Sequence, residues 1–128
     1  MSTRAYVAGS VLDPRRSRRI SRELLSPEAA QEVAETFSLL GDATRTRLLH
    51  ALSVEELCVS DLSALLGITQ SAASHQLRLL RDRRLVGVRR EGRHTFYRLR
   101  DEHIRTLVDM GVSHAAEEEA APTRRKSR

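Results

Sequence analysis

The feature that most constrains the fold is a pair of short helix-forming segments joined by a glycine turn. The first segment is capped by Ser60 and ends at Gly67, and the second is capped by Thr69 and continues to about Arg83. Serine and threonine cap free helical amides, and glycine adopts the left-handed conformation that ends a helix. Two helices joined in this way, the second beginning with polar side chains, are typical of a helix-turn-helix whose second helix enters a DNA major groove.

Two β-prone runs, residues 85–90 and 94–99, follow this pair and flank a turn that contains Gly92. This pattern predicts a β-hairpin, here called the wing. Further helices are expected from the cap Ser26 to about Leu40, from the cap Asp42 through Leu52, and from the cap Asp101 to Glu119. We therefore predict a mainly α fold with a small β-hairpin, a winged helix-turn-helix of order α-α-α-α-β-β-α.

The length of 128 residues suits one domain with two tails. We expect a basic, largely disordered arm over residues 1–25, a winged helix-turn-helix and dimerisation domain over 26–119, and a basic C-terminal tail over 120–128. One cysteine precludes an internal disulfide, and no long apolar run or signal-like stretch is present. The expected location is the cytoplasm, with no membrane association.

Positive charge gathers on the segment that would contact a duplex. The chain has 22 Lys and Arg against 17 Asp and Glu, and nine arginines lie between Gln70 and Arg100 against only Asp82 and Glu91. An ordinary solvated face is the alternative, but this concentration favours double-stranded DNA as the partner. We predict contacts to base edges or nearby phosphates from Gln70, Ser71, Ser74, His75 and Gln76, and phosphate or minor-groove contacts from Arg78, Arg89, Arg90 and Arg93.

The last predicted helix carries two histidines on one face. His103 and His114 are eleven residues apart, which is three turns plus about 20° and about 16 Å along the axis, so one ion cannot bind both. Asp101 accompanies the first histidine and Glu117 lies one turn beyond the second. If an identical helix packs antiparallel across a two-fold axis, the opposite ends meet and form two sites of two nitrogens and two oxygens.

Such donors suit a tetrahedral Zn²⁺ site, with Co²⁺ as a substitute. The predicted metal ligands are Asp101, His103, His114 and Glu117, and the metal is regulatory, since four protein ligands leave no open position for catalysis. The site requires a homodimer, which also agrees with the low aromatic content of 3%. The alternative is that these side chains are merely solvated. No enzymatic activity and no small organic substrate are expected.

From Ala34 to Glu117 the chain resembles the ArsR/SmtB family of metal-responsive repressors. The resemblance rests on Glu56-Leu57-Cys58-Val59-Ser60-Asp61-Leu62, Ser74-His75-Gln76-Leu77-Arg78, Gly92-Arg93-His94-Thr95-Phe96-Tyr97 and the Asp101-x-His103 and His114-x-x-Glu117 pair. It implies an apo homodimer that represses by binding operator DNA and is released by zinc, in the setting of metal homeostasis.

The family also has a thiolate metal site, which Cys58 matches at one position. Ser60 stands where thiolate sensors often carry a second cysteine, and the arm before Ser26 supplies no Cys or His. Cys58 is therefore only a secondary thiol candidate. The alternative function is a winged-helix regulator that does not use metal and either responds to redox through Cys58 or is constitutive.

Overall fold

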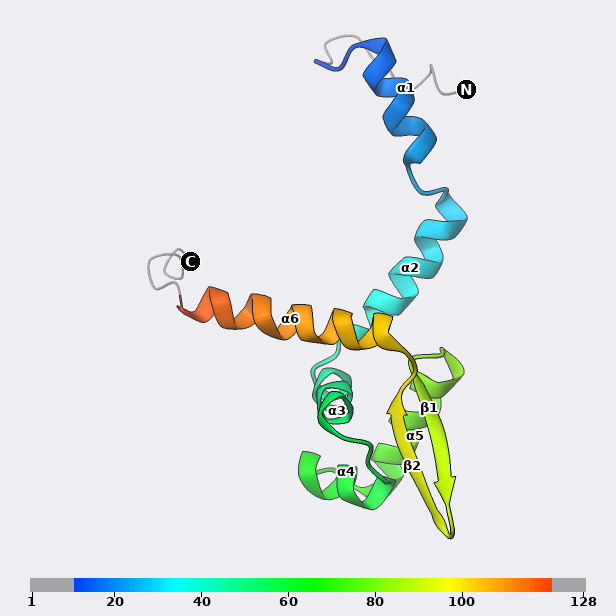
Figure 1. Ribbon diagram of the computed structural model, residues 1–128, viewed down its shortest axis with the longest axis vertical. Helices are drawn as coiled ribbons and strands as arrows, with labels where there is room; N and C mark the ends of the chain where they lie inside the picture. The colour runs from blue at the N-terminus through cyan, green and yellow to red at the C-terminus, as the bar shows by residue number, and fades with distance from the viewer. Residues whose placement is uncertain (1–10, 121–128) are drawn as a thin grey trace. The chain divides into compact units, whose positions relative to one another are not determined.

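The computed structural model describes residues 11–120, which fall into two units that divide between Glu35 and Thr36. Figure 1 shows the elements in chain order. They are α1 (Pro14–Glu23), α2 (Pro27–Leu40), α3 (Ala43–Val54), α4 (Val59–Leu66), α5 (Gln70–Asp82), β1 (Val86–Glu91), β2 (His94–Leu99) and α6 (Glu102–Ala120). From residue 27 onward this is the predicted winged helix-turn-helix order.

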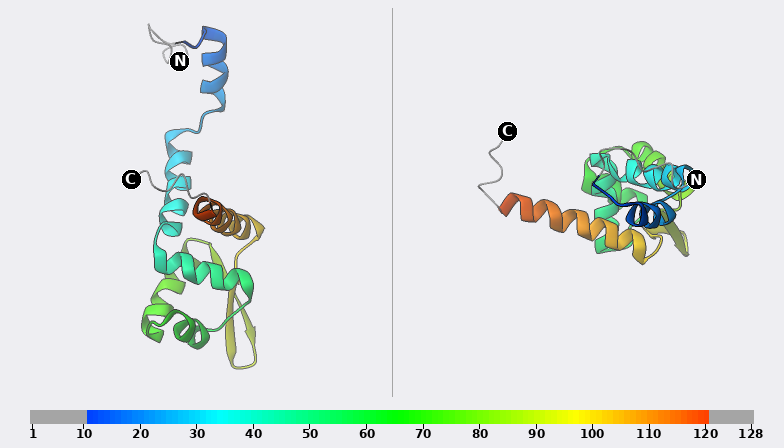
Figure 2. Two further views of the ribbon diagram at one scale, coloured as in Figure 1. Left: turned by 90° about the vertical axis from the view of Figure 1, so that its left-hand side faces the viewer. Right: turned by 90° about the horizontal axis from the view of Figure 1, so that it is seen from above.

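The core of the second unit is made almost entirely of leucine and valine. Leu48 and Leu49 of α3, Leu62 of α4 and Leu80 of α5 are completely buried. Helix α3 contacts α4, β2 and α6, and α5 contacts α4 and β1 (Figures 1 and 2). These contacts fix the recognition elements against one another within a single chain.

The local helix signals are confirmed at most positions. The Asp42 carboxylate accepts the Arg45 amide at 3.0 Å, and the Thr69 hydroxyl accepts the Ala72 amide at 3.0 Å. Gly67 has a φ of 72°, in the left-handed region. The predicted cap of α4 is wrong: this helix begins at Val59 behind Cys58, whose carbonyl accepts the first helical hydrogen bond, so Ser60 lies inside the first turn.

The two strands form an antiparallel hairpin in which Val86 pairs with Leu99 and Glu91 pairs with His94. Gly92 turns the chain with a φ of 63°. A single bridge joins Leu57, in the segment before α4, to Tyr97 on β2. The base of the wing is therefore held by backbone hydrogen bonds to the helical core.

The expectation of a disordered arm is wrong for residues 14–23, which form α1. Asp13 caps this helix by accepting the Arg16 amide at 2.8 Å, and Pro14 occupies the first turn, where proline is favourable. Apart from Pro14 at its start, Ile20 is the one apolar residue of this helix, so no series of apolar residues at helical spacing indicated it. Residues 1–10 and 121–128 lie outside the described residues.

Helix α6 changes character along its length. Ile104 and Val108 in its first half are buried against the core, whereas every residue from Asp109 to Glu119 is exposed. Figure 1 and the right-hand view of Figure 2 show its second half extending away from α3, α4 and α5. Across residues 11–120, no helix combines the length and the apolar character that a membrane crossing would need.

Candidate nucleic-acid interface

Helix α5 presents one polar face and one buried face. Gln70, Ser71 and His75 are exposed and Ser74 is half-buried, while Leu77 and Leu80 are buried in the core on the opposite side. The polar face lies in the first turns of the helix, the part of a recognition helix that contacts base edges. Four of the five residues predicted to contact bases or nearby phosphates therefore share an accessible surface.

Gln76 is the exception on this helix. It is half-buried, and its Oε1 accepts a hydrogen bond from Arg45 Nη1 at 3.5 Å. Arg45 Nε in turn donates to the Leu39 carbonyl at 2.9 Å. The structure thus places Gln76 against α3, where it links the two helices.

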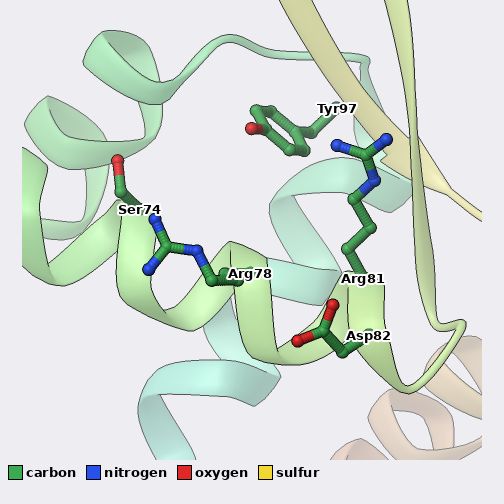
Figure 3. Close-up of a pocket in the computed structure, with 5 residues that line it drawn as sticks. All are labelled: Ser74, Arg78, Arg81, Asp82 and Tyr97. Atoms are coloured by element: carbon green, nitrogen blue, oxygen red, sulfur yellow. The ribbon is translucent and has the colours of Figure 1, made fainter.

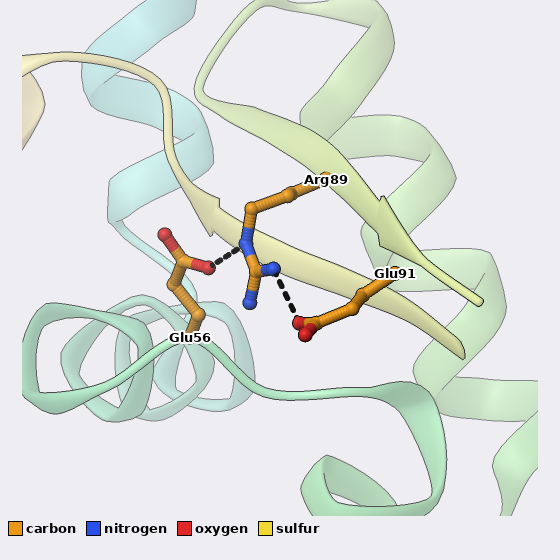
Figure 4. Close-up of polar contacts among 3 residues, drawn as sticks. All are labelled: Glu56, Arg89 and Glu91. Atoms are coloured by element: carbon orange, nitrogen blue, oxygen red, sulfur yellow. Dashed lines mark hydrogen bonds and ion pairs between the residues drawn. The ribbon is translucent and has the colours of Figure 1, made fainter. Parts of the chain in front are cut away.

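The three predicted wing arginines also divide into exposed side chains and one that is bonded within the chain. Arg90 and Arg93 are exposed at and beside the hairpin tip. Arg89 is engaged, since its Nε donates to Glu56 Oε1 at 2.6 Å and its Nη1 to Glu91 Oε1 at 2.7 Å (Figure 4). Its guanidinium also lies 4.8 Å from the centroid of the Phe96 ring.

These contacts change the electrostatics of the wing. The hydrogen bond that Arg89 donates to Glu91, followed by the one that it donates to Glu56, raises the pKa of Arg89, and the hydrogen bond from Arg89 lowers the pKa of Glu91. Two carboxylates already neutralise this guanidinium. Arg89 is therefore placed to anchor the wing to the segment before α4, a role that sequence spacing does not reveal because Glu56 is 33 residues away.

A polar pocket of about 490 Å³ lies between α5 and β2, and sequence reasoning missed three of its residues. Ser74 and Arg78, both predicted site residues, line it together with Arg81, Asp82 and Tyr97 (Figure 3). Arg81 follows Ser74 by seven residues, a helical spacing that could have indicated it. Tyr97 comes from the wing, and only the tertiary fold brings it to this face of α5.

The predicted metal ligands occupy the two ends of α6. Asp101 Oδ1 accepts the Ile104 amide at 3.1 Å and lies 3.6 Å from His103 Nδ1, so the structure brings these two residues together. The His103 side chain is 93% exposed, and His114 and Glu117 are exposed on the second half of the helix. Between residues 11 and 120, no three or more His, Cys, Asp or Glu residues gather closely enough to hold a metal ion.

Cys58 is half-buried at the start of α4. Its thiol donates to Asp61 Oδ2 at 3.2 Å and lies 3.3 Å from Ser60 Oγ. The thiol therefore has two oxygen neighbours from its own helix turn, and the chain has no second cysteine. Its surroundings are those of a hydrogen-bonded thiol.

Comparison with known proteins agrees with this geometry. A family model described as bacterial regulatory protein, arsR family, matches residues 42–88. The chain is 46% identical over 100 residues to a transcriptional repressor SmtB homolog from Synechocystis sp., covering 78% of this chain and 76% of the relative. The region matched by the family model contains α3, the helix-turn-helix and the start of the wing.

Solved structures agree as well. The AntR antimony-specific transcriptional repressor is 38% identical, with a TM-score of 0.69 over 76% of this chain and 88% of that one. The homodimeric winged helix-turn-helix DNA-binding domain of Mb0332 from Mycobacterium bovis is 28% identical, with a TM-score of 0.65 over 75% and 91%. Because the chain is 46% identical to a relative of which it covers 76%, and the arsR family model matches it, this chain belongs to the ArsR/SmtB family of metal-responsive winged helix-turn-helix transcriptional repressors, whose matched members are regulators and not enzymes.

Proposed function

We propose that this protein is a zinc-responsive repressor that binds operator DNA as an apo homodimer and is released when zinc binds between its subunits. The observation that carries the proposal is the division of the ligands on α6. Asp101 and His103 lie together at one end, and the exposed His114 and Glu117 lie about 16 Å further along the same helix. Each end has one imidazole and one carboxylate, which is half of a four-ligand set.

The donor chemistry fits zinc. Imidazole nitrogen and carboxylate oxygen are both zinc ligands, and two of each complete a tetrahedral set. Asp101 uses Oδ1 to cap α6, which leaves Oδ2 for a cation. Zinc would supply a bridge between subunits, held by Asp101 and His103 of one subunit with His114 of the partner subunit and Glu117 of the partner subunit.

An apolar surface on α6 supports the homodimer. Leu107, Val108, Gly111 and Val112 of α6 line an apolar hollow of about 240 Å³ with Leu40 and Thr46. Val112 is 42% exposed and the neighbouring Met110 is 65% exposed. A second copy of α6 packed here would bury this surface and bring the two ligand pairs together. The similar winged helix-turn-helix domain of Mb0332 is homodimeric.

The DNA-binding surface follows from which polar groups remain free. We assign base edges and adjacent phosphates to Gln70, Ser71, Ser74 and His75, which share the polar face of α5. Arg78, Arg90 and Arg93 supply phosphate or minor-groove contacts. Arg89 and Gln76 are assigned to positioning, because both are already bonded within the chain.

The test is operator affinity measured by fluorescence anisotropy, with a duplex that the purified dimer has selected from a random pool. Zinc, cobalt, cadmium and nickel are compared with chelator. A coupling of about 1 to 3 kcal/mol predicts that zinc weakens binding by roughly 5- to 150-fold. His103→Ala should retain the chelator affinity and lose the zinc response, whereas His50→Ala, which removes an exposed histidine of α3, should keep both.

A regulator that does not use zinc is distinguished in the same experiment. If wild-type protein binds the duplex and zinc leaves the affinity unchanged, the zinc proposal fails and the DNA proposal stands. If cadmium alone weakens binding and Cys58→Ser abolishes that effect, the sensor is the thiol. The hydrogen bond from Cys58 to Asp61 and the absence of a second cysteine argue against this outcome.

A further inference from the structure

The polar pocket between α5 and β2 has the side chains of an anion site. Ser74, Arg78 and Arg81 lie along one stripe of α5, since residues four and seven apart share a helix face. In Figure 3 the Tyr97 hydroxyl points toward the Ser74 end of this stripe, and the Arg81 guanidinium lies beside the other end of the tyrosine side chain. The pocket thus combines two guanidiniums and two hydroxyls from two elements.

The two guanidiniums of the pocket are not committed elsewhere. Arg45, Arg89 and Arg105 each donate to protein oxygens. Arg78 and Arg81 have no such hydrogen bond or ion pair within residues 11–120, and both are exposed. A guanidinium presents planar paired donors that match the oxygens of phosphate.

The charge of the pocket indicates which phosphate it fits. Two arginines and the carboxylate of Asp82 give the lining a net charge of about +1 when all three are ionised. A backbone phosphodiester carries one negative charge, whereas a phosphate monoester carries about −1.5 to −2 at neutral pH. The lining therefore balances a diester better than a free or terminal phosphate.

We propose that this pocket seats a backbone phosphate of the operator duplex, with Arg81 and Tyr97 as contact residues in addition to the predicted set. The proposal rests on the proposed DNA-binding function. Ser74 and Arg78 belong both to the pocket and to the recognition face, so one duplex reaches both. Arg81 lies about 10 Å along the axis from Ser74, toward the end of α5 away from the base-reading turns, where the sugar-phosphate wall is expected.

The first test replaces Arg81 with glutamine and uses Arg47→Gln as the matched control. Both residues are exposed arginines, and Arg47 lies on α3 outside the pocket. Full-length protein with chelator is titrated with the selected duplex and with an unrelated duplex over a range of salt. Arg81→Gln should weaken binding to both duplexes by a similar factor of about 5 to 10 and reduce the salt slope by about 1, since a phosphate contact carries no sequence information. Arg47→Gln should change neither.

The second test is Tyr97→Phe, which removes the hydroxyl and keeps the ring and the backbone bridge to Leu57. Loss of one neutral donor should weaken binding to both duplexes by about 3- to 10-fold without changing the salt slope. Wild-type affinity in this variant would remove the tyrosine from the proposed site.

The outcomes separate this proposal from the DNA-binding proposal. If Arg81→Gln binds like wild type while Ser71→Glu abolishes binding, the pocket assignment is overturned and the DNA-binding function remains. If wild-type protein binds neither duplex, the proposed function itself fails. Inorganic phosphate, titrated at constant ionic strength, should produce no saturating change in the Tyr97 resonances. Saturation that depends on Arg81, with duplex affinity independent of Arg81, would make the pocket a free-anion site.

Discussion

The helix-turn-helix with its wing and the second half of α6 differ in how much support one chain provides. Leu77 and Leu80 of α5 and Val86 of β1 are 1%, 0% and 1% exposed, and the wing is anchored to Glu56 and Leu57. In contrast, every residue of α6 from Asp109 to Glu119 is exposed, including Met110 and Val112. The helix-turn-helix and the wing are packed within one chain, whereas residues 109–119 of α6 are exposed.

This difference separates the two halves of the proposed function. A single chain places its recognition face and wing without help, so DNA recognition needs the dimer only to pair two half-sites. The proposed metal site would need the dimer, since each end of α6 has only two candidate ligands. Under this proposal, metal binding would be coupled to the arrangement of the two subunits, which also sets the spacing of the two operator half-sites.

The largest effect is expected from a cavity in the recognition unit. Leu80→Ala removes a completely buried side chain and should lower the free energy of unfolding by about 2 to 5 kcal/mol. Leu65→Ala, at a position 61% exposed on α4, should cost less than about 0.5 kcal/mol. Urea denaturation followed by circular dichroism measures both; equal losses would contradict a core centred on α5.

A charge on the outer half of α6 should weaken the dimer with little effect on the fold of the chain. Val112→Glu places a carboxylate in the apolar hollow and should raise the dimer dissociation constant by at least about tenfold, or about 1.4 kcal/mol. Ser113→Glu adds the same charge one residue away, outside the hollow lining, and should have a much smaller effect. Sedimentation equilibrium with chelator present measures the dimer dissociation constant of each variant. Equal constants for the two variants would show that this face is not the interface.

The recognition unit can also be strengthened at the end of α5. Arg84 has a φ of 64°, in the left-handed region where a non-glycine residue costs about 1 to 2 kcal/mol. Its amide bonds to the Arg81 carbonyl and the Leu85 amide bonds to the Leu80 carbonyl, which is the Schellman arrangement that favours glycine here. Arg84→Gly should stabilise the protein by about 1 kcal/mol, whereas Arg78→Gly, inside the helix, should destabilise it by a similar amount. Thermal unfolding at equal protein concentration measures both, and destabilisation by both variants would refute the strain argument.

The smallest effect concerns the ion pair between Arg89 and Glu91 within β1. The hydrogen bond from Arg89 lowers the pKa of Glu91, so the charged pair favours the folded hairpin fully at pH values above the ordinary glutamate pKa. The contribution is lost as the pH falls through the lowered pKa, and it does not vary near neutral pH. The wing amides of the wild-type protein should lose protection from hydrogen exchange over this pH range, and the loss should be smaller in Glu91→Gln. The same loss of protection in the variant would assign the pH dependence to another titrating group.

Prediction from the sequence succeeded where the signal is local. The caps Asp42 and Thr69, the left-handed Gly67 and the turn at Gly92 each act within a few residues of themselves, and all occur as expected. Helix α1 was missed although its cap Asp13 is also local, because one apolar residue, Ile20, makes no apolar period. From residue 27 onward the order of elements could be predicted, since its signals are local.

The tertiary structure alone decided which arginines are free. Arg89 pairs with Glu56 across 33 residues, and Tyr97 comes from the wing to join Arg81 on α5. Residue type and spacing treat Arg89, Arg90 and Arg93 alike, because the free energy of a charge depends on partners that distant segments bring to it. The sequence by itself determined the winged helix-turn-helix and the spacing of His103 and His114 along α6, and the fold determined which arginines are engaged within the chain.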